Sequence, residues 1–258
     1  MSTTDIVRPA GTEIGATARA SLKPFWIAAA ALVALAAGLR VYQEIFGWRT
    51  GLDFYAPEFQ SYWGVILQGA APIGLASTAL VVGYLWRTRD RKLDALSPAA
   101  EMRRLQLLVQ WLAVFGLAIY LGLSFFTEQT AVWHMTAVRD TAFTPSNLIT
   151  FYISYPLFAI IGIGAFFYAK TRLPLFARGY SVAFLVLVVG MVMTIPTVGL
   201  NEWGCTFWLM EEIFASPLHW GFVFFGWMAL AVFGVALTIL GRIRELLGPD
   251  GVSIILGR

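Results

Sequence analysis

Few side chains in this sequence could bind a metal or support redox chemistry, and they gather in short polar segments between long apolar ones. The sequence contains two histidines, His134 and His219, and one cysteine, Cys205. Other polar groups in the same segments are Asp140, Asn147, Asn201, Glu202, Glu211 and Glu212. Each histidine has a tryptophan beside it, which also fits the more common role of an interfacial hydrogen-bonding histidine. Spacing alone therefore leaves both a metal site and ordinary loop residues open.

The strongest donor set begins at Asn201. Asn201 and Cys205 are four residues apart, so on a helix they would share one face. His219 could join them from the start of the last apolar segment if the chain turns at Ser216 and Pro217. An imidazole and a thiolate suit copper(I) or zinc, with the amide oxygen as a weaker ligand. We therefore expect a metal site formed by Asn201, Cys205 and His219, although the set is not unique.

A second pair with the same spacing, Thr130 and His134, lies in the segment expected to be the loop before the fourth apolar run. A hydroxyl is a poor ligand for a soft metal, so His134 is the only metal ligand that we expect from this pair. The sequence has no glycine-rich phosphate loop, nucleophile elbow or HExxH motif, so a hydrolase or a nucleotide-driven enzyme lacks support.

The elements that must position these residues are membrane helices. Of the 258 residues, 59% are hydrophobic and 13% charged, far from the balance of a soluble domain. Six apolar segments are long enough to cross a bilayer, which takes roughly 20 helical residues. They cover residues 24–45, 62–86, 105–126, 148–169, 182–200 and 218–240. Since lipid offers the backbone no hydrogen-bond partners, and the segments are too long for barrel strands, we predict an all-α, polytopic membrane protein.

Charge orients the six predicted helices. Of the eighteen Lys and Arg residues, all but Arg40, Arg49 and Arg139 lie in the two ends of the chain or in segments 87–104 and 170–181. The positive-inside rule then places both termini in the cytoplasm and the loops 46–61, 127–147 and 201–217 on the other side. The net charge of +3 thus reflects topology and not nucleic-acid binding.

The chain is predicted to form one transmembrane domain, residues 22–247, with a loosely ordered arm at 1–21 and a tail at 248–258. A cleaved signal peptide is the alternative for the first apolar segment, because Arg19 and Lys23 precede a short apolar core. We favour a retained helix, since the apolar character resumes at Val41 and cleavage would leave an odd number of spans.

Five motifs, in order, resemble those in the C subunit of the copper-dependent membrane monooxygenases that act on methane, ammonia or short-chain alkanes. They are GLDFYAPEFQSYW, GYLWRTRDRKLDALSPAAEMRR, FTEQTAVWHMTAVRDTAFTPSN, YAKTRLPLFARG and GLNEWGCTFWLMEEIFASPLHWGF, and the resemblance spans residues 40–240. It implies a bacterial complex, in cytoplasmic or intracytoplasmic membranes, that hydroxylates its substrate with O₂. It also implies copper as cofactor, A and B subunits as partners in a trimer of heterotrimers, membrane lipid contacts, and quinol as electron donor.

The resemblance also implies metal ligands, and this sequence departs from them. The family pattern has aspartate, histidine and histidine where this chain has Thr130, His134 and Asn147. It has asparagine, histidine and histidine where this chain has Asn201, Cys205 and His219. A thiolate binds copper(I) tightly, but sulfur beside activated oxygen risks its own oxidation.

Three hypotheses follow from the sequence. The first is a working C subunit with copper held by Asn201, Cys205 and His219, residues that would then be catalytic. The second is a structural C subunit with degenerate metal sites. The third is a six-helix transporter or channel component, which lacks the ionisable residues deep in the membrane and the paired broken helices expected of one. The natural substrate cannot be read from one chain of such a complex.

Overall fold

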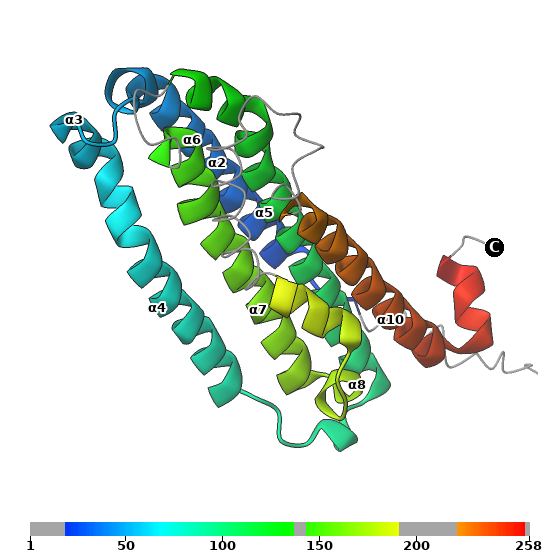
Figure 1. Ribbon diagram of the computed structural model, residues 1–258. Helices are drawn as coiled ribbons and strands as arrows, with labels where there is room; N and C mark the ends of the chain where they lie inside the picture. Colours follow the sequence, from blue (N-terminus) through cyan, green and yellow to red (C-terminus); the bar gives the residue numbers. More distant parts are fainter. Residues whose placement is uncertain (1–18, 137–142, 191–220, 256–258) are drawn as a thin grey trace, which may run out of the picture.

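The structure is a computed structural model that describes residues 19–136, 143–190 and 221–255. Within these ranges the chain forms helices and no strand, which confirms the predicted all-α class. Five long helices, mostly side by side in Figure 1, make up most of the molecule. They are α2 (Lys23–Thr50), α4 (Val65–Arg87), α5 (Pro98–Thr136), α7 (Tyr155–Arg172) and α10 (Gly221–Ile255). The short elements are α3 (Pro57–Phe59), α6 (Pro145–Asn147), α8 (Pro174–Ala177), the 3₁₀ turn η2 (Leu93–Ala95) and the π-helical segments η1 (Gln60–Gly64) and η4 (Leu148–Ser154).

Four of the six predicted membrane spans are present as helices of sufficient length and apolarity. They are Lys23–Thr50, Pro57–Arg87, Pro98–Gly122 and Pro145–Arg172, each with a mean hydropathy of 1.8 in its most apolar window. For the fifth span the structure describes a helix at 182–190, and the rest lies outside the described residues. Helix α10 covers residues 221–240 of the sixth. The count of six, and the location of both termini in the cytoplasm, stay predictions.

The helices extend further than the apolar segments do. Helix α5 continues to Thr136, so Thr130 and His134 lie on a helix, and their predicted placement in a loop was wrong. No proline or glycine occurs between Gly122 and Pro145 to stop it. Because a helix satisfies its own backbone hydrogen bonds, and these residues include no strong helix breaker, it can continue beyond the apolar layer. Helix α2 likewise runs past residue 45 and ends where the N–H of Gly51 donates to the carbonyl of Gly47.

Helices α5 and α7 form the centre of the bundle, with α2, α4 and α10 around them (Figure 1). Fully buried side chains from three of these helices fill the core: Leu105, Leu108 and Phe115 on α5, Phe158 and Ala165 on α7, and Met228, Val235 and Ile239 on α10. Small residues let the central helices approach closely. A Cβ on Gly164 would lie 2.7 Å from the ring of Trp111, and one on Gly122 would lie 2.8 Å from Cβ of Ser154. Close backbone approach of this kind is typical of packing between membrane helices.

Two of the loops predicted to be cytoplasmic meet at one end of the bundle, which we call the basic end and define by residues 87–104 and 170–179. There Arg104 Nη2 lies 2.9 Å from Asp90 Oδ2, and Arg104 Nη1 donates to the carbonyl of Arg172 at 2.7 Å. Arg172 in turn donates to the hydroxyl of Thr88 at 2.6 Å. These bonds join the ends of α4, α5 and α7. Residues 46–64 and 143–150 lie at the opposite end (Figure 1).

A bidentate ion pair holds helix α10 to α5 near the basic end. Arg242 Nε lies 2.8 Å from Glu101 Oε1, and Arg242 Nη2 lies 3.0 Å from Glu101 Oε2. The Glu101 side chain is only 5% exposed. Because a guanidinium matches a carboxylate in this geometry, the pair sets the rotation of α10 as well as its distance from α5.

Candidate functional site

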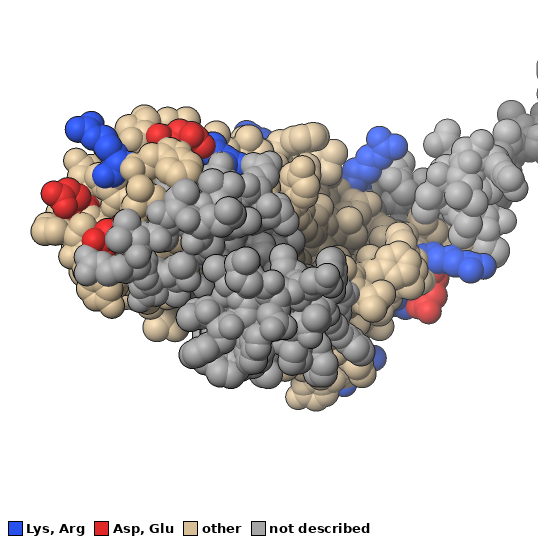
Figure 2. Space-filling model, turned by 45° about the horizontal axis from the view of Figure 1, so that its top comes forward, with Lys and Arg blue, Asp and Glu red and all other residues tan. Residues whose placement is uncertain are grey.

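Of the four predicted metal ligands, three lie outside the described residues and one lies on a described helix. Asn201, Cys205 and His219 lie outside the described residues, so the metal site they were predicted to form stays a prediction. His134 lies on α5 near its end, where the structure describes the backbone but not the side chain. Within the described part of the chain, no group of three or more His, Cys, Asp or Glu side chains comes together. Figure 2 looks obliquely toward the opposite end, and the charged side chains of described residues that this view shows lie mostly toward its left and right edges.

Asn147 is held in a buried turn at this end. The side chain of Thr144 caps α6 by accepting a hydrogen bond from the N–H of Asn147, and Pro145 occupies the first helical position, where a missing N–H does no harm. Thr144, Ser146 and Asn147 are all at most 1% exposed. Helix α6 packs against α5 and α2, so the amide of Asn147 belongs to the interface of three segments.

The helix that follows is wound more loosely than an α-helix. In η4 the N–H of Tyr155 donates to the carbonyl of Thr150, five residues back, and the hydroxyl of Ser154 donates to the carbonyl of Ile149 at 3.0 Å. Pro156, next along the chain, has no N–H to continue the usual ladder. Single π-helical turns of this kind occur often at functional sites.

The first family ligand set does not fit copper in this chain. Thr130 and His134 are one turn apart on α5, and α6, which carries Asn147, packs against that helix. The set offers one imidazole, one hydroxyl and one amide, and the last two are weak donors for copper(I). The second set, with an imidazole, a thiol and an amide, fits copper(I) by donor chemistry.

The structure also reveals two buried polar side chains at this end that the sequence analysis did not single out. Gln43 on α2 is 1% exposed, and Thr150 on η4 is 2% exposed. Among the described residues, neither the amide of Gln43 nor the hydroxyl of Thr150 has a hydrogen-bond partner. The signal in the sequence was a single glutamine inside the predicted first span, but one polar residue near the end of an apolar run is common.

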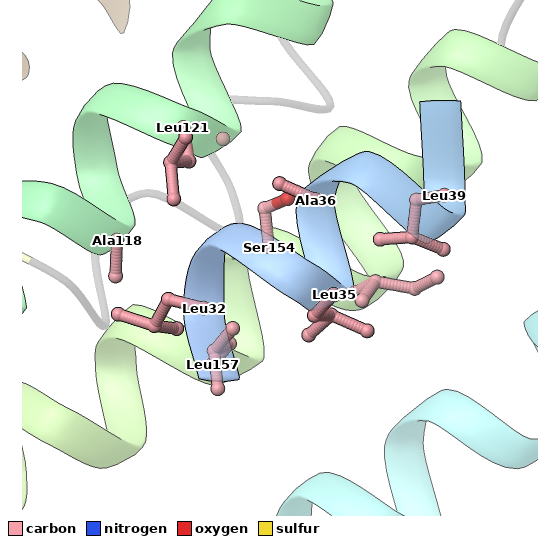
Figure 3. A pocket seen from close by; sticks show the side chains of 10 residues that line it. Leu32, Leu35, Ala36, Leu39, Ala118, Leu121, Ser154 and Leu157 are labelled. Carbon is pink, nitrogen blue, oxygen red and sulfur yellow. The ribbon is translucent and has the colours of Figure 1, made fainter. Parts of the chain in front are cut away.

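A small cavity lies between α2, α5 and the η4–α7 helix (Figure 3). Ten residues line it: Leu32, Leu35, Ala36, Leu39, Ala118, Leu121, Gly122, Ile153, Ser154 and Leu157. The centre of a water molecule can occupy a volume of about 20 Å³ within it. The cavity can therefore hold about one water molecule. Ser154 carries the only hydroxyl in this lining. The cavity is therefore a nearly apolar space with one polar group at its wall.

A family model described as the C subunit of ammonia monooxygenase/methane monooxygenase matches residues 12–250. The match extends beyond the motifs at both ends and confirms the resemblance seen in the sequence. No curated protein matches the chain.

Proposed function

This chain belongs to the C-subunit family of the ammonia and methane monooxygenases, and we propose that it is the C subunit of a copper-dependent complex that hydroxylates ammonia, methane or a short-chain alkane with O₂. The observation that carries the proposal is the family match over residues 12–250. The four described helices that are long and apolar enough to cross a membrane agree with it. A transporter or channel component has no comparable support.

The proposed copper ligands of this chain are Cys205 and His219, with Asn201 as a weaker third. A thiolate and an imidazole are both good ligands for copper(I), and the family pattern has its second ligand set at these positions. Copper, when bound, would supply the oxygen chemistry. The residues of this chain would hold the metal and keep its surroundings dry and apolar.

The partners proposed for this chain are A and B subunits in a trimer of heterotrimers, with quinol as the electron donor. The exposed apolar side chains of α2 and α4 support neighbours within the membrane. Trp26 and Ile27 on α2, and Ile73, Leu75 and Leu80 on α4, are between 60% and 74% exposed. Lipid and companion subunits both suit such a surface. The proposed location is the cytoplasmic or intracytoplasmic membrane of a bacterium.

Copper content of the purified complex tests the ligand assignment. We expect Cys205→Ala and His219→Ala each to lower the copper content of the complex by an amount stoichiometric with its C subunits. Inductively coupled plasma mass spectrometry measures this content. His134→Ala serves as the comparison, because its neighbours in the first ligand set are weak donors, and we expect a much smaller loss. Unchanged copper in both the Cys205 and His219 variants, with the complex intact, would count against the assignment.

The second candidate function is a structural C subunit whose metal sites have degenerated. The observation that favours it is the first ligand set, in which Thr130 and Asn147 replace an aspartate and a histidine. Asn147 is completely buried in the capped turn of α6, a setting typical of a packing residue. In that case the Cys205 and His219 variants would keep full activity as well as full copper, because another subunit would hold the catalytic metal.

A further inference from the structure

An apolar groove lies between helices α2, α5 and α7, away from the predicted metal ligands. Its walls include Pro24, Ala28, Ala31 and Leu35 on α2, Trp111 on α5 and Ile161 on α7. Its volume is about 480 Å³, within the range of about 300–1,000 Å³ that is typical of ligand sites. Eleven of its twelve lining side chains are aliphatic or aromatic, and the amide of Gln110 is the exception. The groove therefore suits a hydrocarbon ligand.

The groove reaches from one edge of the predicted first span to its middle. Pro24 is the first residue of the apolar segment 24–45, and Leu35 lies at the centre of that segment. Residues 24 to 35 cover about 16 Å of helix. Because the hydrocarbon core of a bilayer is about 30 Å thick, the groove has the depth of one leaflet. Pro24, Ala31 and Leu35 are exposed, so a lipid can reach it from the side.

The width of the groove excludes a helix as its occupant. A volume of about 480 Å³ over a length of about 16 Å gives a mean cross-section of about 30 Å². A helix with its side chains is about 10–12 Å across, which corresponds to a cross-section of about 80–110 Å². An extended acyl chain is only one methylene group wide and fits. The groove can thus take in a lipid chain, but not a helix of a companion subunit.

Two hydrogen bonds hold the entrance of the groove in place. The N–H of Ala20 donates to Oε1 of Gln106 at 2.6 Å, and Nε2 of Gln110 donates to the carbonyl of Ser21 at 3.1 Å. Gln106 and Gln110 are one turn apart on α5, and Gln110 also lines the groove. The segment that leads into α2 is therefore fixed against α5, toward the basic end of the bundle.

Two positive charges, Arg19 and Lys23, lie on this entrance segment. Both residues are exposed, and Lys23 directly precedes Pro24 in the groove wall. The carboxylates of the basic end and of the adjoining part of α10 have other cations as partners: Asp90 pairs with Arg104, Asp94 with Arg178, and both Glu101 and Glu245 with Arg242. Among the described residues, no ion pair involves Arg19 or Lys23. Their charge therefore suits a phosphate at the membrane surface.

We propose that this groove binds one acyl chain of an anionic phospholipid, with the phosphate of that lipid at Arg19 and Lys23. The lipid comes from the leaflet next to the basic end, because the groove opens at that end and stops at the middle of the bilayer. Each basic residue near the surface favours an anionic over a zwitterionic lipid by about fivefold. The proposal requires a membrane, but neither the proposed copper ligands nor the proposed reaction.

Photo-crosslinking of the intact complex in phosphatidylcholine nanodiscs tests the proposal. Trace phosphatidylglycerol and phosphatidylcholine probes carry a diazirine at the middle of the same acyl chain. Light releases N₂ and leaves a carbene, which inserts into a nearby C–H or N–H bond, and peptide mass spectrometry locates the adduct. We expect phosphatidylglycerol to label Trp111 and Ile161 about fivefold more than phosphatidylcholine, or better. Leu75 and Leu80, each 74% exposed on α4, should be labelled equally by both probes.

Equal labelling of Trp111 by the two probes would overturn the proposed anionic lipid. Absence of labelling at Trp111 with either probe would overturn it as well, and would show that a companion subunit or another segment of this chain covers the groove.

Filling the groove gives a second measurement. Ala28→Phe places a ring where the small alanine side chain leaves space, and we expect phosphatidylglycerol labelling of Trp111 to fall to the background level. Ala30→Phe is the matched control, because Ala30 is exposed on the same helix and does not line the groove. Labelling of Trp111 that survives Ala28→Phe at the level of the control would contradict the placement of the chain.

Removal of the charges tests the headgroup without altering the groove. We expect Arg19→Gln/Lys23→Gln to abolish the preference for phosphatidylglycerol at Trp111. Arg91→Gln/Lys92→Gln is the matched control, since it removes two exposed charges from the basic end outside the groove. The same preference in both double variants would overturn the proposal.

Discussion

Gly51 and Pro145 lie so close that a Cβ added to Gly51 would be 2.3 Å from Cγ of Pro145. This contact fixes the end of α2 against the start of α6, the segment that carries Asn147. Gly51 ends α2 at a φ of −108°, so space and not backbone conformation demands glycine here.

We expect Gly51→Ala to destabilise the protein by about 1–3 kcal/mol, because the new methyl group overlaps the proline ring and one helix must move. Thermal unfolding of the complex in detergent measures the change. Gly38→Ala on the same helix is the control, since nothing lies within 4 Å of a Cβ at Gly38. A neutral Gly51→Ala variant would show that α2 and α6 shift apart without cost.

The ion pair between Glu101 and Arg242 predicts an asymmetric mutational response. We expect Arg242→Ala to cost roughly 2–3 kcal/mol, because it leaves the buried Glu101 carboxylate without a counter-charge. Glu101→Gln should cost less, since the amide can still accept one hydrogen bond and Arg242 can reach Glu245, whose Oε2 lies 2.8 Å from Arg242 Nη1. Equal losses in the two variants, measured as shifts in Tm, would contradict this account.

Because of Asp90, the free energy of unfolding should fall as the pH drops into the acid range. The backbone N–H of Lys92 and the Arg104 guanidinium both donate to its carboxylate and hold the pKa of Asp90 below its ordinary value. A carboxyl with a lowered pKa stabilises the fold above its unfolded pKa of about 4, and this contribution is lost as the pH falls through the lower folded value.

We therefore expect Asp90→Asn to lower stability at pH 7 by less than about 1 kcal/mol, since the pair is partly exposed and screened. The difference between variant and parent should shrink below pH 4. Thermal unfolding in buffers from pH 7 to pH 3 measures it, and a difference that stays constant over that range would contradict the role of the charged carboxylate.

Replacing Cys205 by histidine restores the family ligand pattern at positions 201, 205 and 219. We expect Cys205→His to retain copper at least as well as the parent complex after oxidative handling, because an imidazole does not oxidise as a thiolate does. Copper content before and after exposure to peroxide provides the measurement. Faster copper loss from the histidine variant than from the parent would contradict a ligand role for this position.

The sequence predicted the membrane helices better than their limits. Long apolar runs located four spans, because length and apolarity alone decide whether a helix can cross lipid. Hydropathy could not place the end of α5, since the polar residues from Glu128 onward continue the helix through their own backbone hydrogen bonds. The end of a membrane helix depends on helix-breaking residues as well as on polarity.

The candidate metal site stays a prediction of residue chemistry. Residue types and spacing predict Cys205 and His219 as metal donors, whereas their meeting depends on the packing of segments outside the described residues. Gln43 and Thr150 were missed for a related reason. Whether a single polar residue in an apolar run faces lipid, a headgroup or a closed interface depends on neighbouring helices that are distant in sequence.

Helix α4 has a practical consequence for work on the isolated chain. None of the residues in its most apolar window is buried within the chain, and it packs mainly along α7 and η4. Most of the apolar surface of α4 therefore needs cover from lipid or from a neighbouring subunit. Extraction in polymer-bounded native membrane patches keeps both in place and should give a better-preserved sample than detergent does.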